Sequence, residues 1–217
     1  MAVHVKICGI TRLGDALAAV EAGADYLGFN FVAGPRRLER SAAETILRDL
    51  PAGVTPVALV KLAGGLESEW AAWLRAMGIT RLQVYGDTSA EALAAVAAAG
   101  FEPWAACSVR DEQLSGIQVT GAAALVLDTH DPQRWGGTGR TFCWDWVVAA
   151  RAAGRLAGWP PIILAGGLRP DNVAEAVRTV RPFAVDVSSG VEVEGQPGIK
   201  DVEKMRAFVR NARSAGE

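Results

Sequence analysis

Two residues that could accept and donate a proton stand at the ends of apolar segments. Cys8 closes the run Val5-Lys6-Ile7 and precedes Gly9, which leaves room for its sulfur to face a ligand. A thiolate there could act as a base if neighbouring dipoles or cations lower its pKa, although a lone cysteine is commonly a small core residue. Asp128 follows Ala-Ala-Leu-Val-Leu. A carboxyl so placed is expected to be partly desolvated, which raises its pKa and suits a general acid; a helix cap or a solvated loop residue is the alternative.

Glycines and small hydroxyl residues near the end of the chain predict an anion site. Gly166-Gly167 and Ser189-Gly190 each follow an apolar run. Backbone N–H groups in such segments can approach an anion closely. The glycine pair could instead form only a tight turn, but the two segments together favour a bound phosphate.

A basic turn follows the second apolar run of the chain. Within it, Arg36 could bind a carboxylate through two parallel hydrogen bonds. A surface arginine beside Arg37 and Arg40 is the competing interpretation. Spacing alone assigns no catalytic role to Cys107, Cys143 or His130.

These residues must be positioned by short β-like runs that alternate with helical ones. Strands are expected at residues 5–8, 26–31, 57–60, 81–84, 103–106, 123–127, 162–165 and 184–187. The helical segments include a short one at Asp111–Ser115, a first helix capped by Thr11, and capping boxes at Ser41/Glu44 and Thr88/Glu91. Strict alternation implies a parallel sheet, and eight strand–helix pairs favour closure into a (β/α)8 TIM barrel that occupies residues 1–217 as a single domain. Active sites of this fold lie at the carboxyl ends of the strands, where the residues above are placed.

Composition excludes several classes of protein. Of the 217 residues 50% are apolar and 21% charged, and the net charge of −2 gives no basic field for nucleic acid. The sequence has no apolar run of membrane-spanning length and no signal-peptide pattern. Three separated cysteines without CxxC spacing, and two histidines, suggest neither a disulfide framework nor a metal site. We therefore expect a cytoplasmic protein that acts on a small molecule.

Motifs along the chain resemble those of the phosphoribosylanthranilate isomerase family, in the same order. They are Lys6–Thr11, Gly28–Phe31 with Pro35-Arg36, Gln83 with Gly86, Asp128 with Gly136–Gly139 and Phe142, Leu164–Leu168 with Pro170 and Asn172-Val173, Val185–Glu192, and Gly198 with Lys200-Asp201. The matches extend from residue 5 to about residue 201. The first, seventh and eighth are together highly specific.

The resemblance implies an Amadori rearrangement in tryptophan biosynthesis. N-(5-phosphoribosyl)anthranilate would become 1-(2-carboxyphenylamino)-1-deoxyribulose 5-phosphate, without a metal or an organic cofactor, in a monomer or homodimer. Carried over by motif, Cys8 is the base, Asp128 is the acid and Arg36 holds the anthranilate carboxylate. The remaining substrate-binding positions are Gly166, Gly167, Ser189 and Gly190, whose backbones would hold the phosphate, and Asp186 from the eighth motif.

Four positions depart from the family pattern. Tyr85 replaces the usual His, Lys61 the usual Asn, Gly34 the usual Ser and Cys143 the usual Asp. None removes the expected acid or base. Tyr85 and Lys61 are expected near the mouth of the barrel, so they affect substrate details and rate.

Two rival functions remain open. The histidine-pathway aminoaldose isomerase runs the same rearrangement on a substrate with two phosphates, and Gly64-Gly65 could hold the second. That enzyme, however, has aspartate where Cys8 stands. A catalytically silent barrel that binds a phosphorylated ligand is the other rival, but such a protein needs no acid–base pair.

Overall fold

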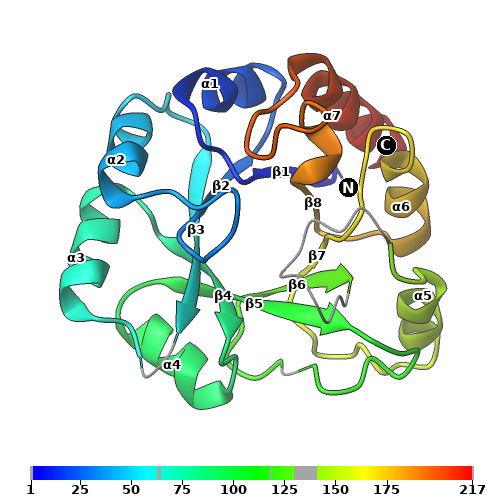
Figure 1. Cartoon of the computed structure of the whole chain (residues 1–217). Helices are drawn as coiled ribbons and strands as arrows, with labels where there is room; N and C mark the ends of the chain where they lie inside the picture. Colours follow the sequence, from blue (N-terminus) through cyan, green and yellow to red (C-terminus); the bar gives the residue numbers. More distant parts are fainter. Residues whose placement is uncertain (1, 63–64, 118, 130–140, 217) are drawn as a thin grey trace.

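Eight parallel strands close into a barrel in the computed structural model, which describes residues 2–62, 65–117, 119–129 and 141–216. Each strand pairs with its neighbours in the sequence, and β8 pairs with β1 (Figure 1). The strands are β1 (His4–Cys8), β2 (Tyr26–Asn30), β3 (Thr55–Leu62), β4 (Arg81–Gly86), β5 (Glu102–Val109), β6 (Ala124–Thr129), β7 (Ile162–Leu164) and β8 (Ala184–Val187). The predicted TIM barrel is confirmed.

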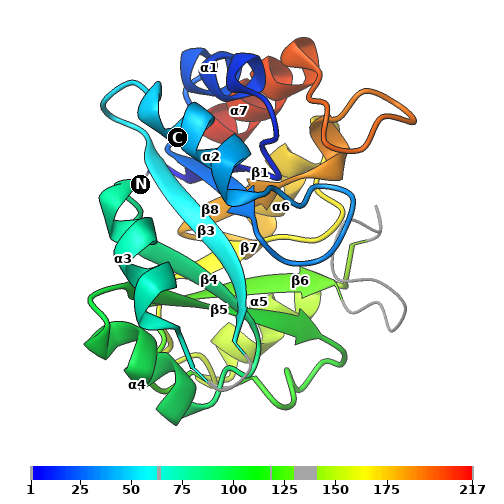
Figure 2. The ribbon, with the colours of Figure 1, turned by 60° about the vertical axis from the view of Figure 1, so that its left-hand side comes forward.

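Helices surround the strands on the outside of the ring (Figures 1 and 2). They are α1 (Leu13–Glu21), α2 (Arg40–Arg48), α3 (Ser68–Ala76), α4 (Ala90–Ala98), α5 (Asp145–Ala152), α6 (Val173–Val180) and α7 (Val202–Gly216). A 3₁₀ turn, η1 (Ser189–Val191), follows β8 directly. None of the described helices is long and apolar enough to cross a membrane.

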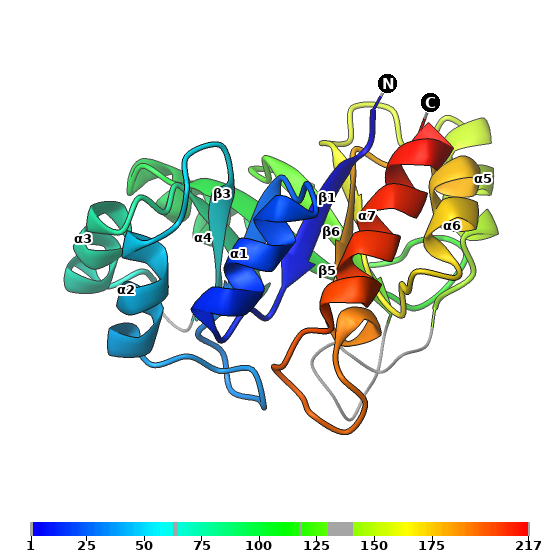
Figure 3. The same cartoon turned by 90° about the horizontal axis from the view of Figure 1, so that it is seen from above.

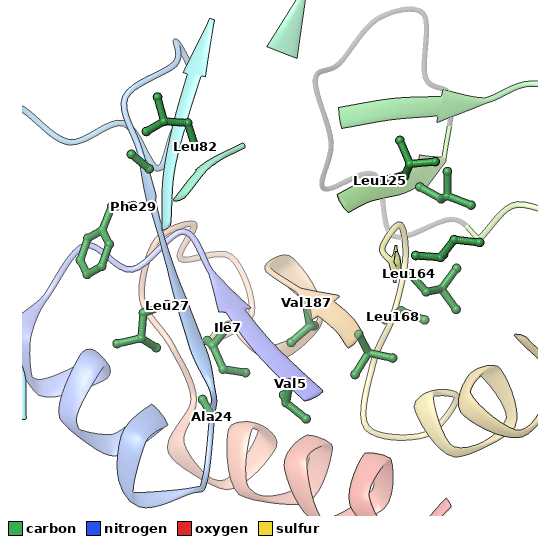
Figure 4. Packing of buried hydrophobic residues seen from close by; sticks show 14 of the residues in the cluster. Val5, Ile7, Ala24, Leu27, Phe29, Leu82, Leu125, Leu164, Leu168 and Val187 are labelled. Carbon is green, nitrogen blue, oxygen red and sulfur yellow. The ribbon is translucent and has the colours of Figure 1, made fainter. Parts of the chain in front are cut away.

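Most of the core lies between the strands and the helices. Successive strand side chains point to opposite faces of a sheet, so Val5, Ile7, Leu27 and Val187 face the helices, and each is at most 2% exposed (Figure 4). A second apolar cluster fills the barrel itself and includes Trp104. The same alternation turns the other side chains of each strand inward, including Lys6 and Cys8 on β1.

The sequence was misread at several local features. Residues 111–115 form turns rather than a helix, and Leu114 there has a left-handed backbone with φ of 57°. A buried leucine anchors this turn, so its apolar character did not indicate a helix.

Three predicted helix caps also differ. Helix α2 follows Glu39 and has no side-chain cap, so Ser41 lies inside the first turn. Ser89, not Thr88, caps α4 by accepting a hydrogen bond from Ala92 N. The Thr11 hydroxyl donates to the carbonyl of Gly198 rather than capping α1.

The two ends of the barrel differ in what they carry. Both termini lie at the end where the strands begin, whereas the loops after β2 and β8 extend from the opposite end (Figure 3). In register, Cys8 pairs with Gly28 on β2, and Lys6 pairs with Asp186 on β8. Polar side chains of several strands therefore meet inside the carboxyl-terminal end.

Candidate active site

A pocket of about 720 Å³ opens at the carboxyl ends of the strands. Its lining comes from β1, β2, β3, β4, β6 and β8 and from the loops after β1, β2, β7 and β8. All eight residues that the sequence nominated line it: Cys8, Arg36, Asp128, Gly166, Gly167, Asp186, Ser189 and Gly190. The fold thus places residues from both ends of the chain, from Cys8 to Gly190, around the same pocket.

Cys8 is 6% exposed and reaches the pocket from the end of β1. Burial raises the pKa of its thiol, and the charge of Asp186 acts in the same direction. Lys6 is the strongest group that lowers this pKa, through its charge, and Lys200 lowers it by a smaller amount. All three cysteines are free.

Asp128 lies near the end of β6, after four buried residues. Desolvation raises the pKa of its carboxyl to about 6, although the amide of Thr129 donates to Oδ1 at 2.7 Å and lowers it. The Asp186 charge raises the Asp128 pKa further, and Lys6 lowers it. This carboxyl can therefore hold or release a proton near neutral pH.

Arg36 is held in an ion-pair network that the sequence did not predict. Its guanidinium donates to Glu192 through Nε at 2.6 Å and Nη2 at 2.7 Å. The Nζ of Lys200 donates to the same carboxylate at 3.0 Å and to the carbonyl of Ser188 at 3.1 Å. Burial opposes the charge of Glu192, but the two cations outweigh it and hold its pKa below the ordinary value.

From the sequence, Glu192 and Lys200 were recognised only as members of family motifs, and no pairing between them was predicted. Glu192 is 6% exposed and Lys200 is 3% exposed. Charged residues are almost never fully buried unless they are paired. A Glu and a Lys in the segment after the last strand, opposite the Arg of the second-strand loop, could have suggested this pairing.

The glycines after β7 and β8 are required by the backbone. Gly166 and Gly167 have φ of 82° and 64°, which disfavour other residues. A Cβ on Gly166 would also lie 2.4 Å from Thr129 Oγ1, and one on Gly190 would lie 2.0 Å from the carbonyl oxygen of Leu168. The loops after β7 and β8 thus approach each other across Gly190.

Asn172 fixes the loop after β7 at the start of α6. Its Nδ2 donates to the carbonyl of Gly167 at 3.0 Å, and its Oδ1 accepts from the amide of Arg169 at 2.8 Å. From the sequence, Asn172 was recognised only as part of the seventh motif. The contact orients the Gly167 peptide, which borders the pocket.

Tyr85 lines the pocket, at the position where the family usually has His. Its hydroxyl accepts a hydrogen bond from Gln83 Nε2 at 2.8 Å. Desolvation raises its pKa well above the ordinary value, with added effects from Asp128, Cys8 and Asp186, so the phenol is neutral.

The other departures from the family pattern lie off the pocket lining. Lys61 is exposed, and its side chain lies next to Gly86 on the neighbouring strand. Cys143 is also exposed. Lys61 was expected near the mouth, but it is not among the lining residues. The motif at 136–139, His130 and Gly64 fall outside the described residues.

Comparisons with known proteins match the chain to one family over nearly its whole length. A sequence model of the family described as N-(5'-phosphoribosyl)anthranilate (PRA) isomerase matches residues 5–211. The N-(5'-phosphoribosyl)anthranilate isomerase of Geobacter metallireducens is 46% identical over 215 residues, covering 98% of this chain and all of the relative.

Solved structures agree as well. Phosphoribosyl anthranilate isomerase from Thermotoga maritima superposes with a TM-score of 0.82 at 33% identity, covering 98% of this chain and 99% of the other. A phosphoribosyl anthranilate isomerase solved with reduced 1-(o-carboxyphenylamino)-1-deoxyribulose 5-phosphate has a TM-score of 0.80 at 31% identity, with the same coverage.

Proposed function

The chain belongs to the N-(5'-phosphoribosyl)anthranilate isomerase family of tryptophan biosynthesis, and from this premise we propose that Cys8 and Asp128 are its base and acid. The substrate would be N-(5-phosphoribosyl)anthranilate, and the product 1-(2-carboxyphenylamino)-1-deoxyribulose 5-phosphate. The observation that carries the proposal is that Cys8 and Asp128 line one pocket, on β1 and β6, which β7 and β8 separate in the closed ring.

The acid step uses the raised pKa of Asp128. Protonated Asp128 gives its proton to the furanose ring oxygen, and the C1–O bond breaks as the anilino nitrogen forms a C=N bond. A carboxyl whose pKa is about 6 retains a protonated fraction near neutral pH, whereas an ordinary aspartic acid retains much less.

The base step acts on the opened sugar. Ionised Cys8 removes the proton from C2, and the electron pair of the C–H bond forms a C1=C2 enolamine. Tautomerisation moves the hydroxyl proton to C1 and leaves the ketone at C2, so substrate and product are isomers. An acid and a base each contribute about 10²–10⁴ to such a rate.

Binding would be shared between the two ends of the substrate. The backbones of Gly166, Gly167, Ser189 and Gly190 are suited to the phosphate because the loops after β7 and β8 approach closely there.

Arg36 is suited to the anthranilate carboxylate. Its contact with Glu192 uses Nε and Nη2, and a guanidinium has five N–H donors. Asp186, which also lines the pocket, would contact the sugar.

The direct test is the fluorescence of N-(5-phosphoribosyl)anthranilate during incubation with the purified protein. The proposal expects enzyme-dependent consumption with formation of the ketose product. A parallel assay uses the histidine-pathway substrate. Binding of the product without consumption of the substrate would identify a silent barrel, and turnover of only the histidine-pathway substrate would replace the proposed reaction.

A further inference from the structure

Lys6 is a buried cation in the interior of the barrel. We propose that it is a positioning residue for the reaction, which stabilises the thiolate of Cys8 while Asp186 holds its ammonium group in place; this inference rests on the proposed role of Cys8. Neither composition nor motif had assigned Lys6 a function.

The geometry places the ammonium between two groups of the site. Lys6 is 0% exposed, and its Nζ lies 3.0 Å from Oδ1 of Asp186, which is its register partner on β8. Lys6 and Cys8 are two residues apart on β1, so both side chains point into the barrel. The Lys6 charge also acts on the thiol of Cys8, and it is the strongest influence that lowers its pKa.

Gly28 provides the space in which the two side chains meet. It pairs with Cys8 in register, and a Cβ at this position would lie 2.7 Å from Cys8 Sγ and 3.1 Å from Lys6 Nζ. Both atoms therefore occupy the volume that a side chain on β2 would fill. Any larger residue would separate the sulfur from the ammonium.

A purely structural reason for this ion pair is weak. Replacing a buried ion pair by apolar residues of similar volume is often neutral or stabilising. The barrel interior is filled elsewhere by apolar residues such as Val57, Trp104 and Val126. A buried ammonium that lies near a candidate base, in a barrel that apolar side chains could have filled, is better explained by its effect on that base.

Several charged or titratable groups face Cys8 from the surrounding elements. Besides Lys6 on its own strand, they are Asp186 on β8, Lys200 and Arg36 in loops, and Tyr85 on β4. Burial raises the pKa of Cys8 most, and Asp186 raises it further. Lys6 lowers it more than Asp186 raises it, and Lys200 lowers it by a smaller amount. Burial also opposes the charge on Lys6, but Asp186 and Cys8 outweigh it and raise the pKa of Lys6, so the cation persists.

The test measures the thiol directly. The rate of alkylation of Cys8 by iodoacetamide is followed against pH by peptide mass spectrometry, in a Cys143→Ser background because Cys143 is exposed. Lys6→Met is expected to raise the midpoint of this profile by about one pH unit or more, as loss of an adjacent opposite charge does. Asp186→Asn is the matched control for the same ion pair, and it is expected to lower the midpoint.

A second variant covers the case in which Lys6→Met fails to fold. The pair Lys6→Met with Asp186→Leu leaves no unpaired charge, and it is still expected to raise the midpoint because the effect of Lys6 on Cys8 exceeds that of Asp186. An unchanged or lowered midpoint in either folded Lys6 variant would overturn the inference.

Turnover then separates this inference from the proposed function. If the midpoint rises in Lys6→Met but Cys8→Ser keeps its turnover, Lys6 controls the thiol and the role of Cys8 as base is wrong. If Cys8→Ser is inactive while the midpoint is unmoved in Lys6→Met, the base assignment stands and the role of Lys6 is wrong. The alkaline limb of kcat/KM should shift together with the alkylation midpoint.

Discussion

The carboxylate of Glu192 accepts two hydrogen bonds from Arg36, at 2.6 and 2.7 Å, and binds Lys200 and the amide of Gly198 through Oε1 at 3.0 Å. One carboxylate therefore joins the loop after β2 to the segment after β8. Glu192, in the segment after β8, therefore fixes the position of the Arg36 side chain, which is expected to bind the anthranilate carboxylate of the substrate.

Glu192→Gln should destabilise the protein, because it leaves the Arg36 and Lys200 cations without their shared anion. Removing one partner of a buried ion pair costs about 3–5 kcal/mol in the free energy of unfolding. Urea denaturation measures it. Glu44→Gln is the matched control, since Glu44 pairs with Arg48 on the surface of α2, where such pairs contribute roughly 0.3–0.5 kcal/mol. Equal losses in the two variants would show that the Glu192 network contributes no more than a surface pair.

Arg36→Ala should weaken the binding of the anthranilate-bearing product much more than that of ribose 5-phosphate. A charged bidentate contact contributes roughly 1.5–3 kcal/mol, or about a tenfold to hundredfold change in Kd. Isothermal titration of both ligands gives the comparison. A similar loss for both would mean that Arg36 acts only through Glu192, as a structural link between the two loops.

Gly190→Ala should weaken the binding of inorganic phosphate about tenfold or more, which corresponds to about 1.4 kcal/mol. The added methyl group would lie 2.0 Å from the carbonyl oxygen of Leu168 and force the two loops apart. Gly14→Ala is the control, because nothing lies within 4 Å of the added Cβ on α1. Unaltered phosphate affinity in a folded Gly190→Ala protein would move the phosphate to another part of the barrel.

Asp128→Asn should stabilise the folded state at pH 8 and have little effect at pH 4. The pKa of Asp128 is raised from 3.8 to about 6 on folding. Folding therefore favours the protonated form, and the penalty for the charge develops between pH 3.8 and 6 and is complete above it. Removing it should gain on the order of 1–3 kcal/mol at pH 8. Urea denaturation at both pH values tests this, and a variant equally or less stable at pH 8 would contradict the desolvation of Asp128.

The two raised pKa values also predict the form of the pH–rate profile. The pKa of Asp128 is about 6 and that of Cys8 lies above the ordinary thiol value, so most free enzyme near neutral pH holds ionised Asp128 and neutral Cys8. The productive pair, protonated Asp128 with ionised Cys8, is a minor population whose size is constant between the two pKa values. The profile of kcat/KM should therefore rise to a plateau near pH 6 and fall above the pKa of Cys8.

The positions of the site residues could be predicted because the barrel topology places every strand end in one ring. Cys8 and Asp128 each close an apolar run, and Gly166-Gly167 follows another, so alternation of strands and helices was enough to bring them together. Helix starts were less predictable. Ser41 and Glu44 have the spacing of a capping box, yet the N-cap of α2 is Glu39, two residues earlier, because packing of Ala43, Ile46 and Leu47 sets the position of the helix.

Contacts between distant side chains could not be derived from one sequence. Arg36 and Glu192 are 156 residues apart, and nothing in either local sequence specifies that they pair. In the sequence, Lys6 was recognised only as part of the first strand and of the first family motif. Its function depends on its register with Asp186 and on the space that Gly28 leaves, and register is a property of the closed sheet.

The turnover of Cys8→Ser tests the central claim most directly. A serine hydroxyl is hardly ionised near neutral pH, whereas a thiol can be, and the substitution keeps the shape of the side chain. Substrate consumption, followed by fluorescence with a protein whose folding and product binding match the parent, should fall by about 10² or more. Turnover close to that of the parent protein would contradict the account and return Cys8 to a packing role in the barrel.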